Sequence, residues 1–141
     1  MQKNRVVCIG EALIDRIRNK SNLGFTDFLG GAPANVACAL RKLNIDSIFL
    51  GRLGSDDFGK KLIAQFNKLE VNLDFLQLDN YSSTRVVTIE RDQFGDRFFS
   101  GFEASSDSCF ADEALSKKLI EKELPNLEKI FLETKYLVTG T

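Results

Sequence analysis

A glycine pair and the polar residues beside it form the stretch best suited to hold a ligand. Gly30 and Gly31 are followed at once by Pro33 and Asn35, and then by a run of small and apolar residues. Glycines let the backbone approach a ligand closely, and proline fits the first turn of a helix. The Asn35 amide would lean back over the glycine loop, where it can donate to and accept from neighbouring hydroxyls. This geometry predicts a floor for a small, neutral, hydroxyl-rich ligand, and a tight turn that binds nothing is the alternative.

Asp15 is the second residue that could contact such a ligand. In an extended chain it shares one face with Leu13 and Ile17. An ionised carboxylate at this position could accept two hydroxyl hydrogen bonds, which are strong because the acceptor is charged. The alternative is a carboxylate that is simply solvated.

Arg97 and Phe99 are a third group of candidates, on a predicted β-hairpin. The segments Thr84–Glu90 and Arg97–Phe102 flank a turn at Gly95. On a protruding hairpin, Phe99 could close over a ligand and exclude water, and Arg97 could contact a polar or anionic substrate. Core packing and an ordinary surface charge are the respective alternatives.

Several classes of chemistry are excluded or disfavoured by what the sequence lacks. The chain has no histidine, which excludes Ser-His-Asp and Cys-His catalysis within it. No metal site is predicted, because imidazole and CxxC ligands are both missing. The glycine pair is followed neither by Gly-Lys-Ser/Thr nor by the spacing GxGxxG, so it is not a nucleotide loop of either type.

The composition is that of a globular protein of 141 residues, with 43% hydrophobic and 28% charged residues. With a net charge of −1 and no long basic run, we expect neither nucleic acid nor a membrane as a partner. The three cysteines are far apart and suit a reduced, cytoplasmic protein.

The order of predicted elements favours an α/β fold with a parallel sheet. Apolar runs at Arg5–Gly10, Asp46–Gly51 and Tyr136–Thr139 predict buried strands. They alternate with helices predicted from hydrophobic periodicity. A first hairpin over residues 11–29 and the second hairpin near Gly95 do not fit this alternation, so we expect a separate small β-sheet.

The helices are predicted in more detail from their periodicity and end signals. The first, Pro33–Leu43, should bury a stripe at i, i+3, i+4 and i+7 and end at Asn44 in a left-handed conformation; the stripe comprises Val36, Ala39, Leu40 and Leu43. The second should begin at Ser55 or Asp56 and bury Phe58, Leu62, Ile63, Phe66 and Leu69. A third should span Ala111–Glu123 and be broken by Pro125. Because the last apolar strand has no covering helix after it, we expect the chain to be the N-terminal part of something longer.

Three motifs together resemble those of the PfkB/ribokinase family of sugar kinases, and fructokinases in particular. They are VCIGEALID, FLGGAPANVACAL and GRLGSDDFG. The resemblance covers residues 1–141, including GDRFFSGF and the closing YLVTGT. It implies the N-terminal part of a single ribokinase-like domain, a parallel sheet flanked by helices, with a β lid made of residues 11–29 and 84–102.

The resemblance also implies a reaction and a set of roles. Asp15, Gly31 and Asn35 would hold sugar hydroxyls, Gly30 would shape the loop, and the lid could form a homodimer contact. The reaction would be phosphoryl transfer from ATP, with Mg²⁺, to a primary hydroxyl of fructose. The family's catalytic Asp loop and nucleotide site have no counterpart here, so we expect no catalytic residue in this chain and no activity from it alone. Open alternatives are a kinase for ribose, a nucleoside or a keto-deoxy sugar acid, for which Arg97 is the candidate cation, and a non-catalytic sugar-binding or scaffold protein.

Overall fold

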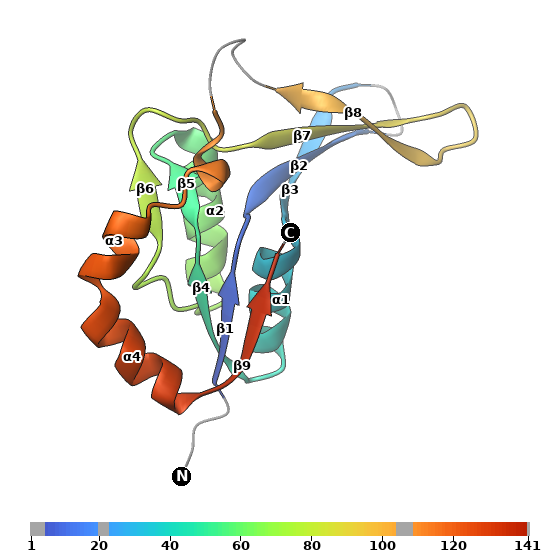
Figure 1. Ribbon diagram of the computed structural model, residues 1–141. Coiled ribbons are helices and arrows are strands. Elements are labelled where there is room, and N and C mark those ends of the chain that lie inside the picture. The colour runs from blue at the N-terminus through green and yellow to red at the C-terminus, as the bar shows by residue number, and fades with distance from the viewer. Residues whose placement is uncertain (1–4, 20–22, 104–108, 141) are drawn as a thin grey trace.

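Strand β1 (Arg5–Ile9) is the middle strand of a three-stranded parallel sheet in the computed structural model, which describes residues 5–19, 23–103 and 109–140. It pairs on one side with β4 (Asp46–Leu50) and on the other with β9 (Thr134–Thr139). All three predicted strands are therefore confirmed, and they lie side by side (Figure 1). Strands β1 and β4 are largely buried as predicted, whereas β9 is mostly exposed. Parallel pairing requires a crossover after each strand, and helices supply these crossovers.

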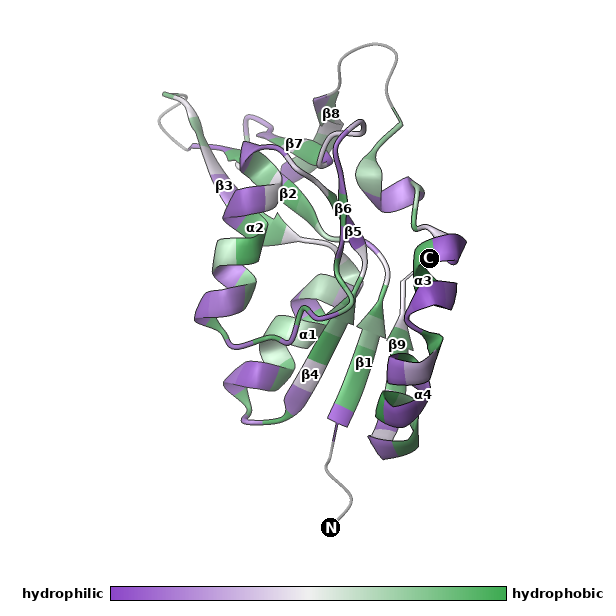
Figure 2. Ribbon diagram, turned by 90° about the vertical axis from the view of Figure 1, so that its left-hand side faces the viewer, coloured by the Kyte–Doolittle hydropathy of each residue, from purple (hydrophilic) through white to green (hydrophobic). Residues whose placement is uncertain are grey.

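Helices cover both faces of this sheet, so β1 is buried on both sides. Figure 2 shows α1 (Ala32–Lys42) and α2 (Asp57–Lys68) on one side and α3 (Lys117–Lys122) and α4 (Leu124–Glu133) on the other. Val6 and Cys8 enter the core beneath α1 and α2, while Val7 packs in the core beneath α4. Alternate residues of one strand thus serve two cores, which explains its continuous apolar sequence.

Helix α1 buries a different face from the predicted one. Its buried residues are small, namely Pro33, Ala34, Ala37 and Cys38. Leu43 is 69% exposed, and Ala39 is exposed as well. The stripe predicted from the larger apolar residues was therefore wrong in part, because small side chains let α1 lie close against the sheet. Asn44 does follow the helix with φ of 59°, as predicted.

Helix α2 confirms its predicted start and stripe. Asp56 is its N-cap, and the Asp56 carboxylate accepts a hydrogen bond from the Gly59 amide at 2.8 Å. Leu62 and Phe66 are fully buried, and Phe66 stacks on Phe49 of β4 at 5.0 Å between ring centroids. The Asp56 carboxylate also accepts from the Thr84 amide at 2.7 Å, so it ties the start of α2 to the chain that leads into β7.

The two predicted hairpins join into one four-stranded sheet, separate from the first. It comprises β2 (Leu13–Arg18), β3 (Phe25–Gly30), β7 (Val86–Arg91) and β8 (Arg97–Glu103), in the order β3–β2–β7–β8. The two hairpins are antiparallel, and they meet through parallel pairing of β2 with β7. This sheet projects beyond the carboxyl ends of β1 and β9 (Figure 1).

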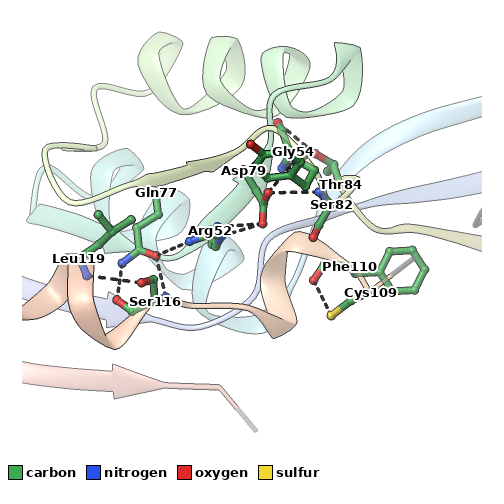
Figure 3. Close-up of polar contacts among 11 residues, drawn as sticks. Arg52, Gly54, Gln77, Asp79, Ser82, Thr84, Cys109, Phe110, Ser116 and Leu119 are labelled. Atoms are coloured by element: carbon green, nitrogen blue, oxygen red, sulfur yellow. Dashed lines mark hydrogen bonds and ion pairs between the residues drawn. The ribbon is translucent and has the colours of Figure 1, made fainter. Parts of the chain in front are cut away.

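A buried polar network fixes the short strands β5 (Arg52–Gly54) and β6 (Gln77–Asp79) beside α3. Asp79 accepts from the Arg52 guanidinium at 2.8 Å and from the Ser82 backbone amide (Figure 3). It also accepts from the backbone amide of Tyr81. These hydrogen bonds, the Tyr81 amide first, lower the pKa of Asp79 to about 2. Gln77 forms hydrogen bonds with Ser116, the N-cap of α3, and so joins this network to the start of that helix.

The predicted helix over Ala111–Glu123 is corrected. The segment holds a short 3-10 helix, η1 (Ala111–Glu113), and then α3, which starts at the Ser116 cap. Pro125 lies in the first turn of α4 and starts that helix, because proline needs no hydrogen-bond donor there. Strand β9 is an edge strand in the described residues, with Tyr136 60% and Leu137 53% exposed.

Candidate sugar-binding site

A cavity of about 370 Å³ opens where the carboxyl ends of β1 and β9 meet the four-stranded sheet. Its lining consists of Gly10, Glu11, Leu13, Arg85, Phe102, Asp112, Glu113 and Gly140. Ligands of open α/β sheets bind outside the carboxyl ends of the strands. The sequence predicted none of these residues as ligand contacts, although several of them neighbour residues that it did predict.

Asp15 lies on β2, on the same face of the four-stranded sheet as Leu13, which lines the cavity. The face is apolar around it, since Asp15 pairs with Phe28 on one side and with Val87 on the other. Among the residues that the structure describes, none donates a hydrogen bond to its carboxylate. Burial raises the pKa of Asp15. The carboxylate is only partly buried, so it can accept hydrogen bonds from a ligand that carries hydroxyl groups.

On the opposite face of the same sheet, the carboxylates are paired with arginines. Arg16 forms an ion pair with Asp27 at 2.8 Å, and Arg18 pairs with Glu90. Hydrogen bonding by Arg16 lowers the pKa of Asp27. Carboxylates on this second face are thus matched with cations, which sets Asp15 apart from its neighbours.

Gly30 and Gly31 connect this sheet to α1 at positions where a side chain has no room. A Cβ atom on Gly30 would lie 2.6 Å from the Asp15 carboxylate oxygen Oδ2. Gly31 has φ of 96°, and its Cβ would lie 2.5 Å from the backbone oxygen of Glu11. The structure therefore brings Asp15 and the glycine pair together. The approach of a ligand to this loop stays a prediction.

Glu11 organises this loop and was not predicted as a site residue. Its carboxylate oxygen Oε1 accepts a hydrogen bond from the Ala32 amide at 3.0 Å, in the first turn of α1. The N-cap residue of α1, Gly31, has no side chain to do this. Asn35 is exposed one turn along, and its backbone N–H donates to the Gly31 carbonyl at 2.9 Å. The Gly-Glu pair after the first strand was a visible signal, but its contact with α1 is set by the fold.

Phe99 and Arg97 lie further out on β8. Phe99 pairs with Ile89 and contacts Phe102, a cavity residue, at 5.1 Å between ring centroids. Arg97 pairs with Arg91, which lies four residues beyond Val87, the partner of Asp15 on β7. At about 3.3 Å per residue, this offset is roughly 13 Å along the strands. The structure does not bring Arg97 to the other candidates.

Arg85 is the basic side chain that lines the cavity in the part of the chain described here. Its guanidinium bonds both carboxylate oxygens of Asp112, at 2.9 and 3.1 Å, and Glu113 at 2.5 Å. It also lies against the rings of Phe102 and Phe110, 5.1 and 4.6 Å from their centroids. This cluster joins the base of β7 to η1. No local sequence pattern predicts this cluster, because Asp112 and Glu113 lie 27 and 28 residues after Arg85.

The residues described here contain no group of three or more His, Cys, Asp or Glu side chains placed to hold a metal ion. None of their helices is both long and apolar enough to cross a membrane.

Sequence and structure comparisons place the chain among sugar kinases. Residues 3–138 match the pfkB family of carbohydrate kinases. The chain is 36% identical over 124 residues to probable fructokinase-5 of Arabidopsis thaliana, covering 83% of this chain and 38% of that relative. The match to the family extends over nearly the whole sequence, and the chain belongs to the pfkB family of carbohydrate kinases.

Solved structures show the same fold. The fructokinase of Xylella fastidiosa superposes with a TM-score of 0.69 at 25% identity, covering 99% of this chain and 53% of that one. Aminoimidazole riboside kinase from Salmonella enterica, complexed with aminoimidazole riboside and an ATP analog, gives 0.65 at 29% identity, covering 82% and 35%. The fold is thus ribokinase-like. The chain spans about half the length of the Xylella fastidiosa fructokinase, and less than half the length of the Arabidopsis relative and of the riboside kinase.

Proposed function

We propose that a protein containing this chain transfers the terminal phosphoryl group of ATP to a primary hydroxyl of fructose, giving fructose 6-phosphate. The observation that carries this proposal is the half-buried, unpartnered Asp15 beside the Gly30–Gly31 loop. Its family is one of carbohydrate kinases, and curated relatives are named fructokinases. The chain would supply the sugar-binding half of the enzyme.

We propose a role for each residue of this site, supported by the contacts described above. Asp15 accepts hydrogen bonds from two sugar hydroxyls, and Asn35 bonds a third from the first turn of α1. Gly30 and Gly31 leave room for the sugar, and Glu11 holds the loop against α1. Phe99 and Phe102 exclude water from one side. Arg97 contacts substrate only if the hairpin bends toward the cavity.

The four-stranded sheet is proposed to act as a lid, formed by residues 11–29 and 84–102 of a single kinase domain. Its Asp15 face is apolar and exposed, with Phe28 at 49% and Phe102 at 50%. Such a patch favours contact with another surface. We propose that two copies meet through this face as a homodimer.

The catalytic base and the residues that hold ATP and Mg²⁺ are proposed to lie in a C-terminal half like that of the relatives. ATP, when bound there, supplies the phosphoryl group, and Mg²⁺ neutralises its charge. This chain positions the acceptor hydroxyl, and alone it should be inactive. We propose that the protein works in the cytoplasm.

A riboside is the second candidate substrate, because a relative of this fold at 29% identity was solved with aminoimidazole riboside. A non-catalytic sugar-binding protein remains the candidate from another class. An assay of ATP consumption, run on the protein expressed with its downstream reading frame, separates these. Turnover with fructose above ribose and nucleosides supports the proposal. Sugar binding without turnover of any acceptor would refute the kinase assignment.

A further inference from the structure

Two features at or beside the cavity would attract an anion, and carboxylates of the chain already occupy both. One feature is the N-terminus of α1, where free amides and the helix dipole favour negative charge. There the Glu11 carboxylate accepts a hydrogen bond from the Ala32 backbone amide at 3.0 Å. The other feature is the Arg85 guanidinium, which Asp112 and Glu113 bind from one side while Phe102 and Phe110 flank it.

The charges around the cavity therefore sum to a negative value. Three carboxylates and one guanidinium line it, for a net charge of −2. Asp112 is 4% exposed and Arg85 17%, so this pair is fixed. Glu113 is 49% exposed, so its carboxylate faces solvent as well as Arg85, and its second oxygen accepts a hydrogen bond from the Cys109 thiol.

We propose that Glu113, with Asp112 and Glu11, determines substrate charge by keeping anionic sugars out of this cavity. The inference rests on the proposed function, and it assigns the selection to residues of this chain. A sugar acid would meet no unneutralised cation in the cavity, and its carboxylate would face the Glu113 carboxylate. A neutral ketose loses nothing by these charges.

Glu113 is the residue that tests this idea with the least damage to the fold. Its removal leaves both hydrogen bonds between Arg85 and Asp112 in place. Glu113→Gln changes the cavity charge by one unit and Glu113→Lys by two. The matched control is Glu133→Gln, because Glu133 is also about half exposed at 48% and also pairs with an arginine, Arg5. That pair lies at the opposite end of β1, where β1 and β9 begin.

The ligands are fructose and 2-ketogluconate, in which a carboxylate replaces the C1 hydroxymethyl group of fructose. Titration calorimetry on the protein expressed with its downstream reading frame gives both dissociation constants, and thermal melts check that each variant folds. We expect wild-type protein to prefer fructose. That preference should fall about tenfold in Glu113→Gln and about a hundredfold in Glu113→Lys, and it should not change in Glu133→Gln.

Salt adds a readout that a purely structural role would not move. Raising the salt concentration from about 0.05 to 0.5 M should weaken the preference of the wild-type protein, because exposed charges are screened. Equal binding of the two ligands by wild type, or an unchanged preference in both Glu113 variants, would overturn the inference while leaving fructose phosphorylation intact. Preference for fructose without phosphoryl transfer would instead refute the proposed function and leave the inference standing.

Discussion

Asp15→Asn should weaken sugar binding while making the fold more stable. The substitution keeps the size of the side chain and removes its charge. In the folded chain, burial raises the pKa of Asp15, so folding favours its protonated form. Its contribution to stability therefore falls as pH rises through the raised pKa, and at neutral pH the ionised group costs stability. Asn removes that cost.

The loss of affinity can be estimated from the hydrogen bonds that the carboxylate would accept. Two bonds to a charged acceptor are worth about 1.5–3 kcal/mol each, and a neutral amide oxygen would recover about 1 kcal/mol. The net loss is roughly 2–5 kcal/mol, which weakens binding by about 30-fold to several thousandfold. Calorimetric titration with fructose measures this loss, and a thermal melt at pH 7 measures stability.

Asp27→Asn is the matched control on the other face of the same sheet. Asp27 is bound by Arg16 and Lys61, and the first of these is the larger cause of its lowered pKa. Its removal should lower stability and leave fructose affinity unchanged. Unchanged affinity in Asp15→Asn, or a lower melting temperature with normal binding, would refute the assignment of Asp15 to the sugar site.

Four further substitutions test the glycine loop and the fold that supports it. Gly31→Ala should cost more than about 2 kcal/mol of stability, because φ of 96° and a contact of 2.5 Å with backbone both oppose a side chain; a chemical denaturation curve like that of wild type would contradict this. Asp56→Ala should cost about 2–4 kcal/mol, because it removes a helix cap and leaves the buried Thr84 amide unpaired. Asp57→Ala, at a side chain 91% exposed, should cost under about 0.5 kcal/mol. Because the pKa of Asp79 falls from 3.8 to about 2 on folding, wild type should lose about 2 kcal/mol as pH drops from 4 to 2, and Asp79→Asn should flatten that loss in acid titrations followed by circular dichroism.

Local signals predicted most of the regular elements. The continuous apolar run of β1, the turn signal at Gly95 and the stripe of α2 each depend on residues close in sequence, and the structure confirms them. The buried face of α1 was partly missed, because hydrophobicity favours large residues while close packing on the sheet required alanines. Pro125 predicts a helix break, but proline equally suits the first turn of a new helix, where the structure places it.

The candidate site could be predicted from the sequence only where its residues are near one another in the chain. Gly30, Gly31 and Asn35 share one loop and one helix turn, so their relation was visible. The contact of Glu11 with Ala32 spans 21 residues, and it depends on where β1 ends relative to α1. The place of Arg97 depends on the register of β7 with β8, which shifts by an irregularity near Thr88. No periodicity in the sequence encodes that shift.

A crystal structure of the protein expressed with its downstream reading frame, bound to fructose, would test the central claim most directly. We predict sugar hydroxyls within hydrogen-bond distance of the Asp15 carboxylate and the Asn35 amide, with the sugar resting on the Gly30–Gly31 backbone. Fructose bound elsewhere, with Asp15 still without a partner, would contradict the proposal that this chain carries the sugar-binding half of a kinase.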